Sequence, residues 1–544
     1  MNISGQNYYL KISGKNETES KIIDSVSYNK KHLTIKSIYD EANLFSEKLN
    51  KIGYVNVSIL ETKKSNDSTF EFDFDLGKKI KFIHVYIGKN SDLKNLQIFE
   101  SKTDTLVMHY SEIENYLTKS IQKLEQKGFA LSKLKLIDVS INKNYLRAEL
   151  YLEIDKKRKF NHFVFKGYEK FPKGYKHNLE RKYRNATFNQ ENLSKINADI
   201  NKIAFVKQTK FPEILFKKDS TNVYVFLEKA KSNKFDGLLG FSNDENQKTK
   251  INGFVDLNLN NILNIGEKIA VFWRNDGKEQ KTFNASLELP FIFKTPIAVK
   301  ASLNIFTQDS IFQNSKSEIN LGYYLGFNSK TYLGYQESES NDIKNTNSNN
   351  LTDFKNNFKT IAFEIDNFLN NKYRNDIFNN INRFQIKFGT GNRISKIDDI
   401  EQVFANLNFE YYLNINRNNI LKIKSENYFL KSDSYKTNEL YRFGGINSIR
   451  GFSENSLQAN LIVALITEYQ YYLSQSLYLH SILDYGYYED QTNLSKNKLL
   501  GLGLGFGLVT KNGIFNLIYA NGSTNEQAIT TSNSVIHISL KSNF

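Results

Sequence analysis

The sequence LYRFGGINSIRGF, residues 440–452, breaks the alternation of apolar and polar residues on either side of it. Its paired glycines, Gly444 and Gly445, argue against a strand. It carries too many large apolar side chains for a solvated loop: Phe443, Ile446, Ile449 and Phe452. Arg450 is a lone cation among them, and a buried guanidinium needs a carboxylate partner. We therefore predict a loop packed inside a larger structure, with Arg450 paired to an acid elsewhere.

Within this stretch, GGINSIRGF (444–452) resembles the arginine-glycine-phenylalanine tip of the lumenal loop in BamA/TamA-type outer-membrane assembly factors, the bacterial surface antigen family. The resemblance implies a loop of about residues 432–456 inside a transmembrane barrel. Its motif residues would be Gly444, Gly445, Ile449, Arg450, Gly451 and Phe452. The alternative is that the tripeptide Arg-Gly-Phe occurs by chance, and the rest of the chain is needed to distinguish the two explanations.

Length and composition allow several domains and a barrel. The chain has 544 residues, and no apolar run approaches the ~20 residues of a membrane-spanning helix. A soluble protein is one interpretation. A transmembrane barrel is another, because its strands of about 10 residues alternate and average out as polar. Aromatic residues make up 14% of the chain, which suits aromatic girdles on a barrel and ordinary β-rich packing about equally.

From about Phe235 onward the pattern is alternation alone, in runs separated by Asn-, Gly- and Ser-rich turns. About sixteen such runs occupy residues 233–544, roughly twenty residues for each strand with its turn, as tilted membrane strands require. An even number allows an antiparallel barrel to close. The fold class that we predict is an α+β N-terminal part, whose units resemble POTRA repeats, followed by an all-β, sixteen-stranded antiparallel transmembrane barrel.

Two runs show the faces of this barrel. In LLGLGLGFGLV (499–509), leucines and Phe506 share one face, which suits lipid, and four glycines share the other, which suits a closely packed segment. The spacing is not a dinucleotide fingerprint. In VIHISLKSNF (535–544) one face holds Ile536, Ile538, Leu540 and Phe544. A terminal aromatic on that face resembles the C-terminal signal of outer-membrane barrels.

The run LYLHSILDYGYY (477–488) offers the acid for the loop arginine. Asp484 and Gly486 lie on its lumenal face, and Asp484-Tyr485-Gly486 resembles the aspartate-x-glycine of the family's thirteenth strand. The resemblance implies that this carboxylate holds Arg450, in a loop joining strands eleven and twelve. Glu468, on the preceding strand, is a second candidate acceptor. The family's mid-barrel proline and glycine are missing after Asp366-Asn367, which argues against a close housekeeping orthologue but not against the fold.

Residues 1–232 repeat one small unit three times, at 1–79, 80–159 and 160–232. Each reads as a strand, a helical region and two further strands. Units of this order and of about 75 residues resemble POTRA modules, the periplasmic arm of the same family. Their exposed strand edges could accept an extended segment of another chain by β-augmentation, or the units could be spacers.

Charge is concentrated in this half. Residues 1–232 contain 42 Lys and Arg against 28 Asp and Glu, of 73 and 58 in the whole chain. A solvated, lysine-rich surface explains the excess better than an acidic partner does. The aromatic residues do not gather into a stacking platform, so we expect no nucleic acid partner.

Enzyme chemistry has no sequence support. There is no HExxH, GxSxG or P-loop, the 7 His lack metal-ligand spacing, and Cys is absent. We expect no catalytic residues, cofactor or metal. The start, MNISGQNYYL, lacks a basic segment followed by an apolar one, so either a signal peptide has been removed or the protein is not exported. The barrel pattern favours removal.

The favoured function is outer-membrane protein assembly or insertion, with the N-terminal modules in the periplasm. The resemblance implies unfolded polypeptide clients, the lipid bilayer and periplasmic accessory proteins as partners. It also implies opening between the first strand, 235–241 with Gly237 and Leu239, and the last, 535–544. The alternative is a two-partner-type secretion porter, which usually has two POTRA modules and a plug helix. Three modules and no such helix before residue 7 favour assembly. A purely structural barrel is a third possibility.

Overall fold

The computed structural model describes residues 7–88, 96, 98, 103–142, 144–243, 249–276, 280–309, 311–344, 351–368, 381–396, 398–510, 513–530 and 534–544. The chain divides into two compact units. One comprises Met1–Phe160 with Asn185–Leu193, and the other comprises Asn161–Arg184 with Ser194–Phe544. None of the described helices is long and apolar enough to cross a membrane.

The first unit begins with a four-stranded sheet in the order β2-β1-β4-β3. Its elements are β1 (Tyr8–Gly14), α1 (Glu17–Asp24), β2 (Lys31–His32), α2 (Ile35–Lys51), β3 (Ser58–Lys64) and β4 (Thr69–Asp75). The Thr34 hydroxyl accepts a hydrogen bond from the Ser37 backbone N–H and so caps α2 at its N-terminus. Phe45 of α2 packs on Phe74 of β4 in one hydrophobic core, which explains why apolar residues at helical spacing precede an alternating run.

A second four-stranded sheet follows, in the order β6-β5-β8-β7. Its elements are β5 (Phe82–Tyr86), β6 (Thr105–His109), η1 (Tyr110–Glu112), α4 (Ile113–Gln126), β7 (Lys133–Asn142) and β8 (Tyr145–Glu153). The predicted helix and hairpin are present, and β6 is an additional strand that the sequence pattern did not predict. β5 pairs with β8 in parallel, as β1 does with β4.

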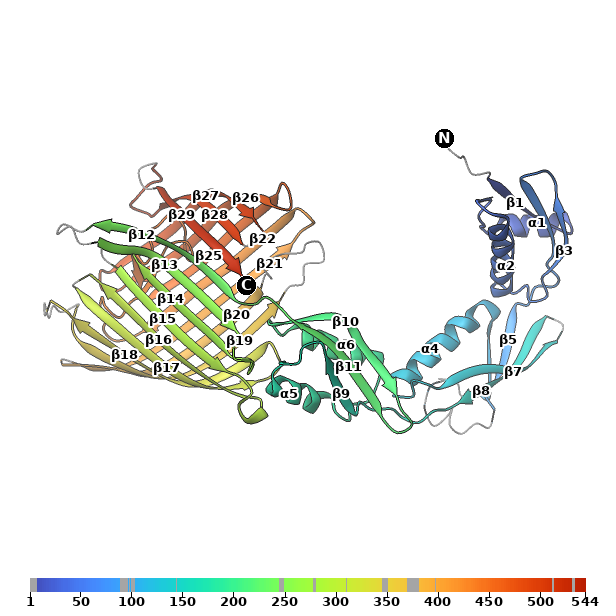
Figure 1. Ribbon diagram of the computed structural model, residues 1–544, viewed down its shortest axis with the longest axis horizontal. Helices are drawn as coiled ribbons and strands as arrows, with labels where there is room; N and C mark the ends of the chain where they lie inside the picture. The colour runs from blue at the N-terminus through green and yellow to red at the C-terminus, as the bar shows by residue number, and fades with distance from the viewer. Residues whose placement is uncertain are drawn as a thin grey trace. The chain divides into compact units, whose positions relative to one another are not determined.

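The third sheet has the order β10-β11-β9. Its elements are β9 (His162–Lys166), α5 (Lys173–Tyr183), α6 (Gln190–Asn201), β10 (Val206–Phe216) and β11 (Thr221–Lys229). The three sheets with their helices confirm the α+β fold class of the N-terminal part (Figure 1). The domain boundaries after residues 79, 159 and 232 stay predictions.

The remaining chain forms a closed antiparallel barrel, which within the described residues has sixteen strands, as predicted (Figure 1). They are β12 (Lys234–Asn243), β13 (Thr249–Asn260), β14 (Lys268–Asn275), β15 (Gln280–Leu289), β16 (Ile297–Gln308), β17 (Phe312–Tyr324), β18 (Ser329–Asp342), β19 (Phe354–Phe368), β20 (Ile381–Ser395), β21 (Asp399–Asn414), β22 (Asn419–Lys431), β25 (Leu461–Tyr472), β26 (Leu477–Asp490), β27 (Ser495–Val509), β28 (Ile514–Ser523) and β29 (Ser534–Asn543). A short 3-10 turn, η2 (Ile292–Lys294), joins β15 to β16. We call the end where β12 begins and β29 ends the proximal end, and the other the distal end.

The two faces of the wall differ as the alternation predicts. Leu483 and Tyr485 on β26 are 55% and 50% exposed on the outside, whereas Asp484 between them is fully buried inside. On β27, Leu504 is 68% exposed and its glycine neighbours face inward. An apolar outside with a polar inside is the pattern of a barrel that faces lipid.

The third sheet is attached to the proximal turns of the barrel. The ring of Tyr175, on α5, meets that of Phe291 edge-on at 4.6 Å between centroids. Asn178 donates to the backbone carbonyl of Lys294 at 3.0 Å, and the side chain of Asn261 donates to the Tyr168 hydroxyl at 2.7 Å. Because these contacts bury an aromatic ring and two polar groups, the third sheet and the barrel form one unit.

We expect Tyr175→Ala to separate the third sheet from the barrel, because truncating a buried aromatic ring costs about 3–5 kcal/mol. Trypsin should then cut the linker between β11 and β12, at Lys231, several times faster than in the unchanged protein. Tyr151→Ala, at an exposed ring, is the matched control. Equal cleavage of all three proteins would show that the ring does not hold the two parts together.

Candidate functional site: the lumenal loop and the barrel seam

The loop that opened the sequence analysis joins β22 to β25, the eleventh and twelfth strands of the barrel. It enters the lumen from the distal end and contains a short hairpin of β23 (Tyr441–Phe443) and β24 (Leu457–Ala459). The motif residues form the tip of this hairpin. The predicted loop, about 432–456, therefore lies within the connection 432–460.

Arg450 lies at the centre of the hydrogen bonds that fix the tip. Its Nε donates to Asp484 Oδ2 at 2.9 Å and its Nη2 to Asp484 Oδ1 at 2.7 Å. Nη1 donates to Glu468 Oε2 at 2.8 Å, and the Arg450 backbone N–H donates to Asp484 Oδ2 at 2.9 Å. The structure thus brings both sequence-predicted acceptors to the same guanidinium, whose planar fork matches the two carboxylates.

The pair is dry. The Arg450 side chain is 4% exposed and that of Asp484 is 0% exposed. Burial disfavours the charge of Arg450, but the hydrogen bonds and charge of Asp484, with those of Glu468, outweigh it, so the pKa of Arg450 is raised. Glu468 also accepts a second hydrogen bond, because the Gln470 side chain donates to its other carboxylate oxygen at 2.7 Å. A buried charge with partners on two neighbouring strands holds the loop against one part of the wall.

Small residues let the loop approach this wall. A Cβ at Gly501 would lie 2.3 Å from the carbonyl oxygen of Arg450, and one at Gly486 would lie 2.4 Å from Ile449 Cδ1. Gly451 itself has φ +89°, which disfavours any side chain there. The expectation that all four glycines of 501–507 make room for the loop is only partly right. Gly503, Gly505 and Gly507 instead lie against neighbouring wall residues.

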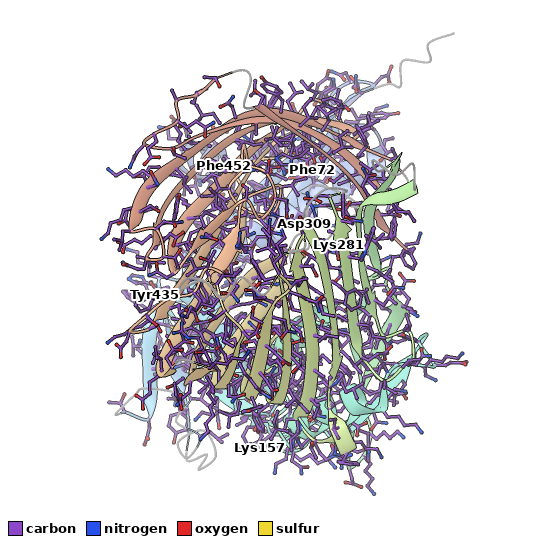
Figure 2. The ribbon with its side chains drawn as sticks, turned by 90° about the vertical axis from the view of Figure 1, so that its left-hand side faces the viewer. Phe72, Lys157, Lys281, Asp309, Tyr435 and Phe452 are labelled. Atoms are coloured by element: carbon purple, nitrogen blue, oxygen red, sulfur yellow. The ribbon has the colours of Figure 1, made fainter. Side chains whose placement is uncertain are left out.

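Apolar packing seals the tip. A buried cluster joins loop and wall: Phe443, Ile449, Phe452, Ala459, Ile462, Ala464, Ile466 and Leu499. Figure 2 shows Phe452 on the inner side of the curved C-terminal strands. Gly444, with φ +100°, and Gly445, with φ +104°, form the turn that returns the chain to this cluster. This explains why a lumenal loop is so rich in large apolar residues.

The loop also reaches the third strand of the barrel, a contact that sequence reasoning missed. Arg274 on β14 pairs with Glu454 of the loop at 3.1 Å. The same Glu454 oxygen accepts the backbone N–H of Ile446 at 3.2 Å. Burial raises the pKa of Glu454, and Arg274 opposes that shift. Because Arg450 is held on β25 and β26, the loop spans the lumen from these strands to β14, the third strand.

Two further anchors hold the base of the loop. Arg393 on β20 is fully buried and pairs with Glu439 at 2.5 Å and with Asp398 at 3.0 Å. Arg442 lies over the rings of Phe306 and Phe312, at 5.6 Å from the second centroid. Burial lowers the pKa of Arg442 to about 10, which leaves it charged at neutral pH. An arginine at the inward position of a predicted strand was the only sequence signal for Arg393.

The barrel closes between β12 and β29, and this seam is short. Among the described residues, only three pairs are in register, from Lys234↔Asn543 to Asp236↔Lys541. Every other described pair of neighbouring barrel strands is in register over eight residues or more. At the end of the paired part, the Asp236 carboxylate accepts the Leu540 backbone N–H at 3.2 Å. Towards the distal end, the two strands continue without paired residues.

The predicted seam residues lie at this closure. Gly237 and Leu239 follow the three paired residues of β12, and Leu239 is 54% exposed. Their counterparts on β29 and the C-terminus are also outward and exposed: Ile536, Ile538, Leu540 and Phe544. The face assignment from sequence therefore matches the geometry. Their role in function stays a prediction.

The described residues contain no group of three or more His, Asp or Glu side chains arranged to hold a metal ion. The interactions at this site are noncovalent: backbone hydrogen bonds at a short seam, and ion pairs and apolar packing that hold the loop.

Comparison with solved structures identifies known proteins of similar fold. No protein-family model matches the chain, and no curated protein sequence does. Among solved structures, CdiB from Escherichia coli is similar with a TM-score of 0.55 and 11% identity, over 92% of this chain and 97% of that one. CdiB from Acinetobacter baumannii gives 0.52 and 14%, over 86% and 90%. BamA from Haemophilus ducreyi lacking POTRA domains 1–3 gives 0.49 and 14%, over 86% and 100%. The similarity to the two CdiB structures confirms the predicted fold.

Arg450→Ala should cost about 3–5 kcal/mol, because it leaves the buried carboxylates of Asp484 and Glu468 without their cation. Asp484→Ala should cost less, because Glu468 still accepts from Arg450. We expect the double variant, Arg450→Ala with Asp484→Ala, to be no less stable than Arg450→Ala alone. Arg450→Lys should retain little of the stability that Arg450 provides, since an ammonium cannot form the bidentate hydrogen bonds of a guanidinium. The measurement is a double-mutant cycle on unfolding in detergent micelles. Strictly additive losses would mean that the two residues are not coupled.

Arg274→Gln should loosen the loop tip without unfolding the barrel. The pair with Glu454 is partly exposed and worth about 1 kcal/mol, so the tip should open about fivefold more often. A cysteine replacing Ser448, which is buried in this cysteine-free chain, reports that opening through its rate of thiol labelling. Lys281→Gln, at an exposed position of β15, is the matched control. An unchanged rate in Arg274→Gln would refute the bridge to the third strand.

Proposed function

We propose that this protein assembles or inserts β-barrel proteins in the bacterial outer membrane, by capturing an extended client strand at the seam between β12 and β29. The observation that carries the proposal is the short pairing of those strands in an otherwise closed barrel. A backbone hydrogen bond contributes about 1 kcal/mol net, so the three-residue pairing costs only a few kcal/mol to open. A client strand regains those bonds by pairing with β12.

The lumenal loop supports this proposal because it bridges the lumen beside the seam. It is anchored to β25 and β26 through Arg450 and to β14 through Glu454. The strands next to the seam can therefore separate while the wall behind them is held in place. The motif residues thus have a positioning role, and none of them is needed for bond chemistry.

The N-terminal sheets would hold clients before insertion. Strand β3 is an edge strand whose seven residues are all exposed, and β7 is the corresponding edge of the second sheet. Unpaired backbone groups at such edges accept an extended segment by β-augmentation. The proposal places these sheets in the periplasm, the barrel in the lipid bilayer, and unfolded polypeptides as clients, with room for accessory proteins on the sheets. It requires no cofactor and no enzymatic step.

A secretion porter of the two-partner type is the second candidate. The polar lumen, with a cavity of about 400 Å³ at its proximal end, favours it. The loop that fills the middle of the lumen opposes it, because a translocating chain would have to displace that loop. Depletion followed by proteomics of the outer membrane separates the two functions. General loss of barrel proteins supports assembly, and loss of one secreted protein supports the porter.

Locking the seam tests the mechanism directly. Phe235 and Ser542 are opposite each other in register, so Phe235→Cys with Ser542→Cys should form a disulfide across the seam. We expect client insertion to stop and to return with reductant. The matched control joins Leu257 and Val271, which pair within the continuous wall. Full insertion activity with a verified seam disulfide would exclude lateral opening and would leave passage through the lumen as the explanation.

A further inference from the structure

The seam between β12 and β29 is shorter than the two strands that form it. On its other side, β12 is paired with β13 along its whole length, from Lys234 to Asn243. β29 is likewise paired with β28, from Ser534 to Lys541. Both strands therefore run beyond the three residue pairs of the seam (Figure 1). The end of a strand does not explain where the pairing of the seam stops.

The register of the three pairs could continue to the distal end of both strands. Each step along β12 moves one residue back along β29, so Gly237 falls opposite Leu540 and Asn243 falls opposite Ser534. Asn243 is the last residue of β12, and Ser534 is the first residue of β29. Continued pairing would thus match the two strands over their full lengths and make the seam as long as its neighbours. Instead, the pairing stops after the third pair.

A backbone donor that continued pairing needs is bound by a side chain. In an antiparallel pair of strands, the backbone hydrogen bonds join every second residue pair. The Phe544 N–H donates to the Asn233 carbonyl at 3.1 Å, so in the same register the Leu540 N–H would donate to the Gly237 carbonyl. The Leu540 N–H instead donates to Oδ1 of Asp236 at 3.2 Å. The donor for the next step of pairing is therefore already occupied.

Neighbouring charges direct the Asp236 carboxylate towards β29. Asp256 lies directly opposite Asp236 on β13, and like charges in opposite positions of neighbouring strands repel each other. On the other side, Lys541 Nζ lies 4.0 Å from Asp236 Oδ2. Repulsion from β13 and attraction from β29 together hold the carboxylate at the backbone of β29, where the Asp236 side chain is 16% exposed.

We infer that Asp236 is a positioning residue that ends the pairing of β12 with β29 and so keeps the seam short. Its carboxylate satisfies the Leu540 N–H, a donor that would otherwise turn to the Gly237 carbonyl. The consequence rests on the proposed function: a short seam opens for a client strand, and a fully paired seam does not. A single carboxylate thereby sets the pairing length on which that function depends.

The test measures how far the seam is paired, through a disulfide beyond its present end. Leu239 and Ile538 are opposite each other in the continued register, and both point outward, 54% and 38% exposed. In Leu239→Cys with Ile538→Cys, the disulfide should form slowly, because the two strands are not paired there. Adding Asp236→Val should speed its formation about fivefold, the factor that one further backbone hydrogen bond contributes. Oxidation is followed on the full chain in detergent micelles, and the sequence has no cysteine of its own.

Asp236→Asn is the matched control, because it keeps a side-chain oxygen that accepts from Leu540 and removes only the charge. With it, the disulfide should form at the unchanged rate. Asp236→Ala should show the same rise as Asp236→Val, and it replaces that variant if a branched apolar side chain prevents folding. A second cysteine pair, Phe235→Cys with Ser542→Cys, lies within the paired part of the seam. Its disulfide should form equally fast with and without Asp236→Val.

Client insertion separates the inference from the function that it serves. We expect a small, urea-unfolded barrel protein to insert into liposomes several-fold more slowly with Asp236→Val than with Asp236→Asn. An unchanged rate of the disulfide between positions 239 and 538 would overturn the role of Asp236 and leave strand capture at the seam standing. Slower disulfides at both cysteine pairs would also overturn it, since Asp236 would then hold the seam closed. A faster disulfide with undiminished insertion would support the role of Asp236 in pairing and overturn strand capture at the seam.

Discussion

The contact between Arg450 and the carboxylates of Asp484 and Glu468 is the interaction on which the lumenal architecture depends. A guanidinium this dry is tolerated only because its donors meet acceptors of opposite charge, at 2.7–2.9 Å. The acids come from adjacent strands, so the loop tip is held on both β25 and β26. The glycines at 451, 486 and 501 follow from the same constraint, since the loop backbone must lie directly on the wall.

The loop contacts both halves of the barrel wall. On β20 to β27 it is held through Arg393, Arg450 and the apolar cluster around Phe443. On β14 to β17 it is held through Arg274, through the rings of Phe306 and Phe312 beneath Arg442, and through Asn314, which donates to the Asn438 carbonyl. The seam between β12 and β29 pairs over three residues. Two neighbouring strands are held together strongly where many of their residues pair, and weakly where the pairing ends after three residues. Under the proposed function, the wall opens where the fewest residues pair, and the loop holds the other strands in place.

The third sheet and the lumenal cavity lie at the same, proximal end of the barrel as the paired part of the seam. The aromatic contact of Tyr175 with Phe291 fixes that sheet to the barrel, and the linker from β11 leads directly into β12.

The sequence by itself determined the barrel, its strand number and which face of β26, β27 and β29 points outward. These follow from a period of two, which any strand must show if one side faces lipid and the other does not. Alternation also placed Asp484 on the lumenal face, but its pairing with Arg450 was implied by the resemblance of the two motifs to a known family. Tertiary structure alone decided the bridge from Glu454 to Arg274, the anchor at Arg393 and the short seam. These depend on which strands face each other across a closed lumen and on where the pairing of two strands stops, and the alternation along one strand contains no information about either.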